Sequence, residues 1–237
     1  MKTQEKNFDG IKLSGFTAIL IMLALTGTAI YLLSLPQTPS IIAGVICGIC
    51  VVVMLPGFMI IQPNNSRVLT FFGRYAGTVI SNGFYWVNPL FLKSTVTLRI
   101  LNLNIDPIKV NDKVGNPIMI GAVVVWRIKD TYKASFDISG NIREFVQIQS
   151  DAALRQVAGM YAYDTNETID KVTLRSDESG EITQRLEDEL NSRLAIAGIE
   201  IVEARINYLA YASEIASVML RRQQADAIIS ARERIVE

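Results

Sequence analysis

The residue types that most often carry enzyme chemistry are scarce in this chain. None of its 237 residues is a histidine, which excludes Ser-His and Cys-His nucleophile pairs, His-ligated zinc and proton transfer by imidazole. The only cysteines, Cys47 and Cys50, lie three residues apart in an apolar run, a spacing that places both on one helix face. We interpret them as packing residues; metal or redox chemistry and acylation are the alternatives.

Carboxylates are more frequent, so their clusters are the remaining candidates for acid–base or metal chemistry. Each cluster lies in a stretch that also carries arginine or lysine, which is typical of solvated or ion-paired surfaces. The sequence has no Gly-x-Ser-x-Gly motif, phosphate-binding loop or metal-ligand cluster. We therefore expect no catalytic residue, no cofactor and no metal. The clusters lie at 177–178, at 187–189, and at Glu200 and Glu203.

The charge balance and the distribution of apolar residues bear on partners. The chain has 23 basic and 23 acidic residues, and it shows no basic cluster of the kind that neutralises nucleic-acid phosphates, so nucleic acid is not expected as a partner. Hydrophobic residues make up 50% of the chain and are concentrated before residue 62. This distribution predicts a membrane part followed by an aqueous part.

Two uncharged segments near the N-terminus are each long enough to cross a bilayer. Residues 15–35 and 41–61 contain no charged side chain, and about 20 helical residues span a hydrocarbon core. Two prolines between the segments favour a turn. The sequence therefore predicts a transmembrane helical hairpin over residues 15–61.

The charges beside the hairpin predict its orientation. Lysines occur in the N-terminal tail, residues 1–14, and Arg67 and Arg74 follow the second segment, whereas the connecting turn is uncharged. By the positive-inside rule both ends lie in the cytoplasm, which places the chain in the plasma or inner membrane with its aqueous part on the cytoplasmic face. A cleaved signal peptide is the alternative for the first segment. Pro56 and Gly57 leave open an early end of the second helix or a re-entrant hairpin.

Small and aromatic residues are candidates for contacts within and beside the membrane. Gly44 and Gly48 form a small-xxx-small pair, expected to pack within the hairpin or against a neighbouring subunit or client helix. The rings of Phe84, Tyr85 and Trp86 suit the bilayer interface, with burial in the domain core as the alternative. Arg67 and Arg74 are either headgroup contacts or ordinary surface charges.

The aqueous part, from residue 62 onward, has the pattern of an α+β domain with strands first and helices after. Runs of β-branched and aromatic residues predict strands over 67–74, 76–83 and 94–104. The turn-rich loop 109–117 predicts a β-hairpin whose second strand includes residues 118–128.

Two amphipathic helices and an extended segment are expected next. The first helix begins at a capping box of Asn141 and Glu144. The second helix ends at Gly198 and is followed by an extended stretch over 199–209. The apolar stripe of the first helix is Ile142, Phe145, Ala152, Val157 and Met160, and that of the second is Ile182, Leu186, Leu190 and Leu194.

Five motifs, taken in order, resemble the SPFH/Band 7 superfamily of stomatin-, prohibitin- and flotillin-like proteins. The resemblance implies an SPFH domain over residues 62–209 that lies on the membrane, a long helix leading away from it, and assembly of many copies into a ring or cage around a patch of bilayer. Members of the superfamily regulate membrane proteases, channels and lipid microdomains rather than catalysing reactions. The motifs are NSRVLTFFG at 65–73, NGFYWVNP at 82–89, NDKVGNP at 111–117, GIEIVEARI at 198–206 and RRQQADAI at 221–228.

The last segment, residues 210–237, is expected to begin a coiled-coil-like assembly helix. From Ser213 onward it contains no terminating glycine or proline. Apolar residues and arginines alternate at three and four spacing, and charges in such a seam favour lateral packing in a ring over a two-stranded dimer. A surface helix packed on its own domain is the alternative. The seam residues are Ile215, Val218, Arg222, Ala225, Ile229, Arg232 and Val236, with Asp226 as an acidic partner.

These patterns predict a homo-oligomeric membrane scaffold with lipids and a membrane protease or channel as partners. A channel or transporter accessory component is the alternative, although no ionisable residue lies within the two apolar segments. A membrane-bound hydrolase of the Ser-Lys or metal-carboxylate type is the third class considered.

Overall fold

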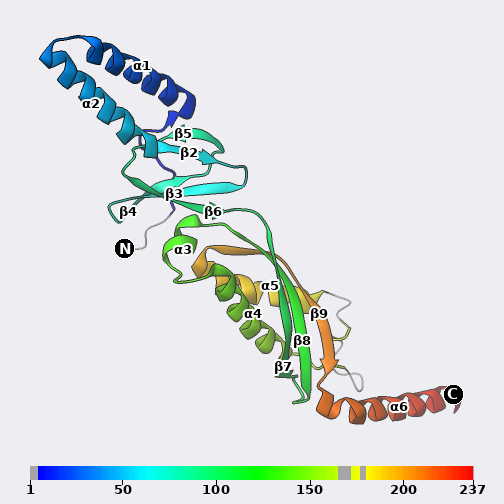
Figure 1. The fold of residues 1–237 in the computed structure, drawn as a ribbon. Helices are drawn as coiled ribbons and strands as arrows, with labels where there is room; N and C mark the ends of the chain where they lie inside the picture. The colour runs from blue at the N-terminus through cyan, green and yellow to red at the C-terminus, as the bar shows by residue number, and fades with distance from the viewer. Residues whose placement is uncertain (1–4, 165–171, 177–179, 237) are drawn as a thin grey trace. The chain divides into compact units, whose positions relative to one another are not determined.

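The computed structural model describes residues 5–164, 172–176 and 180–236 and divides the chain into two units (Figure 1). One unit contains the apolar helices and the strands that follow them. The other contains a long β-hairpin and most of the remaining helices. Unit 1 comprises Met1–Arg99 and Ile128–Asp137, and unit 2 comprises Ile100–Arg127 and Ile138–Glu237.

Both apolar segments are helical and pack against each other in unit 1. They form α1 (Gly15–Ser34) and α2 (Thr38–Met54), and a short 3-10 helix, η1 (Leu55–Gly57), continues α2. Each is long and apolar enough to cross a membrane, and only 11% of each span is buried, unlike the core helix of a soluble domain. The second helix ends before the expected Ile61, because Pro56 lacks the backbone N–H that a continuing α-helix needs.

Two antiparallel sheets follow the hairpin in unit 1. The first has strand order β1-β5-β2, so the strand before α1 and the strand after α2 both pair with β5. The second has strand order β4-β3-β6. Their shared core is a buried cluster that includes Met59, Leu69 and Val87. The strands are β1 (Leu13–Ser14), β2 (Phe58–Ile61), β3 (Asn65–Phe71), β4 (Arg74–Val79), β5 (Gly83–Trp86) and β6 (Phe91–Thr97).

The described residues before α1, 5–14, are docked on unit 1. The Phe8 amide donates to the Thr78 carbonyl at 3.0 Å, and the Thr78 amide donates to the Lys6 carbonyl at 2.9 Å. Further along, Leu13 pairs in register with Trp86. The hairpin is therefore fixed to the same unit on both sides of its helices.

Unit 2 contains the β-hairpin expected around residues 109–117. Its strands pair antiparallel from Leu101 opposite Trp126 to Asn111 opposite Pro117, which confirms that prediction. The expected strand over 94–104 is split between β6 and β7, and the break falls at the boundary between the units. The sheet has the order β7-β8-β9, with β7 (Leu101–Asn111), β8 (Pro117–Ile128) and β9 (Ile199–Tyr211).

The second expected helix is confirmed as α5 (Glu181–Leu194), followed by a 3-10 turn, η2 (Ala195–Ala197). All four residues of its predicted stripe are fully buried. Gly198 then adopts φ +67°, the left-handed conformation that glycine supplies after a helix. The leucine spacing was decisive here because the other residues of this helix are polar. The short helix α3 (Thr131–Phe136) belongs to unit 1.

The first expected helix, α4 (Ile142–Ala158), begins as predicted but buries a different stripe. Asn141 caps it by accepting a hydrogen bond from the Arg143 amide at 2.9 Å. Of the predicted stripe, Val157 is buried, whereas Ile142, Phe145 and Ala152 are half-buried and Met160 lies past the helix end. The buried face of α4, which contacts α5 and β7, instead mixes large apolar residues with small ones. The buried residues are Val146, Ser150, Ala153, Leu154, Val157 and Ala158.

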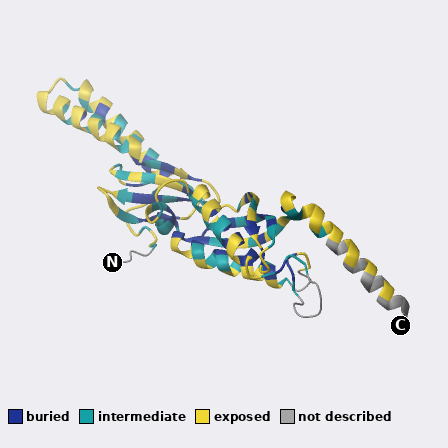
Figure 2. Ribbon diagram, turned by 90° about the horizontal axis from the view of Figure 1, so that it is seen from below, coloured by how far each residue is buried: buried dark blue, intermediate teal, exposed yellow. Residues whose placement is uncertain are grey.

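The last helix, α6 (Ser213–Val236), starts directly after β9. Its first turn is fixed to unit 2, because the Ala212 carbonyl accepts from the Ile215 and Ala216 amides at 3.0 and 3.1 Å, and Lys109 forms an ion pair with Glu214. Farther along, the described side chains are mostly exposed (Figure 2).

Candidate membrane interface

The aromatic segment forms β5, the strand between β1 and β2. Side chains alternate along a strand, so Phe84 and Trp86 lie on one face of the sheet and Tyr85 lies on the other. Phe84 packs edge-to-face on Phe16 in the first turn of α1, with ring centroids 5.6 Å apart, and stacks on Phe58 at 5.5 Å. This ring therefore joins the start of one span to the strand that follows the other.

Trp86 fixes the end of the second span. Its indole Nε1 donates a hydrogen bond to the Met54 carbonyl at 2.9 Å. Gly57 approaches the indole so closely that a Cβ there would lie 2.2 Å from Nε1, so a larger residue would force one of them to move. Tyr85 instead packs against the buried cluster of unit 1. Phe84 and Trp86 therefore contact the ends of the apolar helices, whereas Tyr85 packs at the core of unit 1.

The two arginines considered for headgroup contact occupy different settings. Arg67 is half-buried within β3, opposite Thr95 on β6. Arg74 is exposed at the start of β4, after a tight turn in which Phe72 and Gly73 have φ of 44° and 80°. Arg74 is thus exposed at a turn, whereas Arg67 is partly buried within a sheet.

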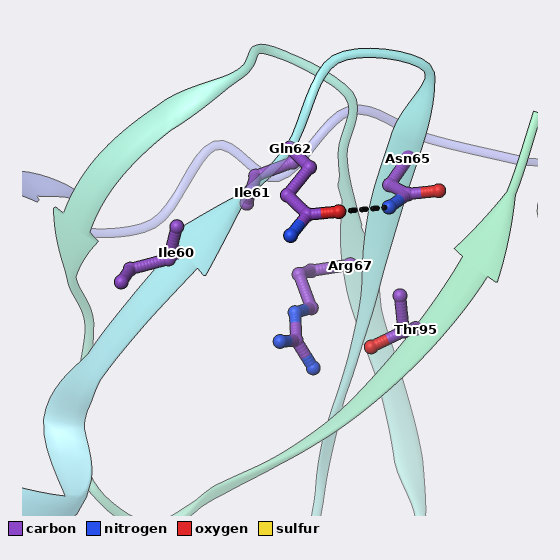
Figure 3. Close-up of a pocket in the computed structure, with 6 residues that line it drawn as sticks. All are labelled: Ile60, Ile61, Gln62, Asn65, Arg67 and Thr95. Carbon is purple, nitrogen blue, oxygen red and sulfur yellow. Dashed lines mark hydrogen bonds between the residues drawn. The ribbon is translucent and has the colours of Figure 1, made fainter.

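Arg67 lines two adjoining cavities in unit 1, of ≈ 340 and ≈ 390 Å³. Around the first, the side chains of Gln62 after β2, Arg67 on β3 and Thr95 on β6 gather (Figure 3). The Gln62 amide also accepts a hydrogen bond from Asn65 at 3.5 Å. The second cavity is more apolar and is lined by Pro56, Phe58, Met59, Ile60, Arg67, Phe84 and Lys93.

Lys93 is a site residue that sequence reasoning missed. It lies two positions before Thr95 on β6, and Thr95 is opposite Arg67, so both cations share one face of the sheet. Its ammonium donates to the Pro56 carbonyl, beside the end of the second span. Burial, and then the charge of Arg67, lower the pKa of Lys93 from its ordinary 10.5. The proximity of Lys93 to Arg67 follows from the register of β3 with β6, which the sequence does not show.

The two glycines of the second span have different surroundings. Gly44 is buried in the hairpin, where an added Cβ would lie 2.8 Å from Leu33 Cγ and 3.1 Å from the Ala29 carbonyl oxygen. An added Cβ at Gly48 would meet nothing within 4 Å. Gly44 therefore lets the two helices approach each other, and Gly48 leaves an open surface on α2.

The described part of the expected assembly seam is accessible on α6. Val218 is 63% exposed, Ala225 and Arg232 are also exposed, and Ile215 near the helix start is half-buried. This exposure argues against the alternative in which the seam packs on its own domain. The side chains of Arg222, Asp226, Ile229 and Val236 lie outside the described residues.

The acidic clusters make structural contacts. Glu187 accepts a hydrogen bond from the Ala204 amide at 3.1 Å, which ties α5 to β9. The cluster at 177–178 lies outside the described residues. Within the described ranges, no group of three or more His, Cys, Asp or Glu is placed to hold a metal ion. The other contacts are ion pairs of Glu189 with Arg193, Glu200 with Arg127, and Glu203 with Arg205.

Comparison with known protein families defines the class of this chain. The model of the SPFH domain / Band 7 family matches residues 59–237, from β2 to the end of α6. The match covers more than half of the chain, so the chain belongs to the SPFH/Band 7 family, as its motifs predicted. A comparison with curated proteins found no match. Together with the two apolar helices, family membership indicates that the protein associates with a membrane.

Proposed function

We propose that this protein is a membrane-anchored scaffold that assembles into a homo-oligomeric ring or cage, gathers lipids, and regulates client membrane proteins such as a protease or channel. It does so by multivalent contact and by limiting lateral diffusion, without catalysing a reaction. The observation that carries the proposal is the pairing of both ends of the apolar hairpin with β5 in a chain of the Band 7 family.

The pairing of both hairpin ends with β5 supports an arrangement in which the whole aqueous part lies on one side of the membrane. The strand before α1 and the strand after α2 flank the same strand, so the chain enters and leaves the hairpin at one place. In this arrangement the N-terminal segment and the Band 7 region share one face of the membrane. The positive charges at both ends of the hairpin support the cytoplasmic face, by the positive-inside rule.

The exposed face of α6 supports assembly. A helix of 24 residues is about 36 Å long and can contact a neighbouring copy over most of its length. Val218, which belongs to the predicted seam, is a large apolar side chain that is 63% exposed. Its burial against a second copy would stabilise a lateral contact.

Particle size tests the assembly. The full chain, solubilised in mild detergent, should form closed rings or cages by electron microscopy, with a mass many times the 26.3 kDa of one chain. Val218→Asp should reduce that mass. Leu220→Asp is the matched control, because Leu220 is 57% exposed and lies on the opposite side of α6. A monodisperse monomer of the unmodified chain would overturn the scaffold proposal.

A further inference from the structure

We propose that the two adjoining cavities at Arg67 and Lys93 bind the headgroup phosphate of an anionic phospholipid, with the first part of its acyl chains against the apolar wall. The proposal rests on the proposed membrane anchoring, because the bilayer must lie beside Gly57, where the second span ends. It adds a defined lipid site to a scaffold that would otherwise contact lipids only through its hairpin.

The positive charges of Arg67 and Lys93 favour the binding of an anion at these cavities. Arg67 and Lys93 share one face of the sheet, and among the described residues no carboxylate forms an ion pair with either of them. Burial, and then the charge of Arg67, lower the pKa of Lys93, so these surroundings disfavour a second positive charge. A bound phosphate reverses that effect, since it attracts both cations.

The polar groups fit a phosphate. The planar guanidinium of Arg67 presents paired N–H donors that match two phosphate oxygens. Gln62 and Thr95 add an amide and a hydroxyl at the rim of the same cavity (Figure 3). Lys93 already donates to the Pro56 carbonyl, which holds its ammonium at the second cavity beside the end of the span.

The apolar wall favours a lipid over a soluble phosphate compound. Phe58, Ile60 and Phe84 line the second cavity next to the cations. Ile60 is 64% exposed, and it lies on β2, which begins directly after the second span. An acyl chain that leaves the bilayer surface at this point would cover Ile60, whereas a free phosphate would leave it in water.

The test compares lipid association in the full chain reconstituted into phosphatidylcholine bilayers. Spin-labelled phosphatidylglycerol and spin-labelled phosphatidylcholine serve as probes, and the immobilised fraction of each is measured by electron spin resonance. The unmodified chain should prefer phosphatidylglycerol. Arg67→Gln and Lys93→Met should each lower that preference by about tenfold, the loss expected for one charged hydrogen bond. Arg74→Gln, which removes an exposed arginine from the same unit, should leave it unchanged.

The outcomes separate this proposal from its rivals. An equal loss of preference in Arg74→Gln would overturn the site, because diffuse surface charge would then suffice. Displacement of the labelled lipid by millimolar inorganic phosphate would overturn the lipid assignment in favour of a soluble phosphate ligand. If the protein forms rings but shows no preference for phosphatidylglycerol, the lipid site is wrong and the scaffold proposal stands. If the protein is monomeric but shows the preference, the scaffold proposal is wrong and the lipid site stands. The thermal stability of each variant, measured in parallel, excludes unfolding as the cause.

Discussion

Trp86 hydrogen-bonds through its indole Nε1 to the carbonyl oxygen of Met54, the last residue of α2. The final carbonyls of a helix lack intrahelical donors, so this contact satisfies a group that the bilayer surface would otherwise leave to water or lipid. The sheet thereby stabilises the end of the membrane helix.

Replacement of Trp86 by phenylalanine should lower the stability of the hairpin. The change removes the hydrogen bond to Met54 and should cost about 1 kcal/mol beyond any loss of packing. Trp126→Phe is the control, since the Trp126 Nε1 is buried without a hydrogen-bond partner among the described residues. Thermal unfolding in detergent measures both. An unchanged melting temperature in Trp86→Phe would contradict the assigned role of the Met54 contact, whereas Trp126→Phe measures the cost of the smaller ring alone.

A larger residue at Gly44 should disrupt the packing of the two membrane helices. An added Cβ at Gly44 meets Leu33 at 2.8 Å, so Gly44→Val should destabilise the hairpin by about 1 to 3 kcal/mol through overpacking. Gly48→Val is the matched control, because that position is open. Equal melting temperatures of the two variants would refute the Gly44 contact. A normal melting temperature but smaller particles for Gly48→Val would assign Gly48 to a contact between subunits.

The pairing of both hairpin ends with β5 also predicts which loops are accessible from outside the cell. In a chain with Cys47→Ala and Cys50→Ala, a membrane-impermeant maleimide should label Gln37→Cys, in the turn between the spans, but not Asn111→Cys. Both should react after detergent lysis, which controls for reactivity. Labelling of Asn111→Cys in intact cells would reverse the orientation. Protection of both positions would instead indicate a re-entrant hairpin.

Lys93→Met should make the stability of the protein in detergent less dependent on pH between neutral pH and pH 10.5. Folding lowers the pKa of Lys93, so below that lowered value the protonated side chain destabilises the folded state. The penalty disappears as pH rises through the ordinary value of 10.5. The difference in melting temperature between Lys93→Met and the unmodified chain should therefore shrink between neutral pH and pH 10.5. A difference that stays constant over this range would contradict the prediction.

The parts of the fold that depend on local pattern were predictable from the sequence. In α5 the leucines at 186, 190 and 194 stand out among polar residues, so their spacing identified the buried face. In α4 the predicted stripe was rotated from the buried one, because apolar residues occur on more than one face and the buried face also includes Ser150 and Ala153. Small residues carry little signal in a hydrophobic pattern.

The candidate site was predictable only in part, because it depends on pairing between distant strands. The aromatic residues of β5 and Arg67 were identified from residue type and from their position after the apolar runs. Lys93 was not, since its approach to Arg67 follows from the register of β3 with β6. The order β1-β5-β2 was equally hidden, because Leu13 and Trp86 are far apart in the sequence.

Leu13 and Phe58 both lie opposite Trp86, one on each side of β5. Neighbouring strands are about 4.8 Å apart, so Leu13 before the hairpin and Phe58 after it are held about 10 Å from each other. That spacing is close to the separation at which helices pack, about 8 to 10 Å. Strand pairing therefore couples the two apolar helices mechanically: a tilt of this sheet must tilt both of them together.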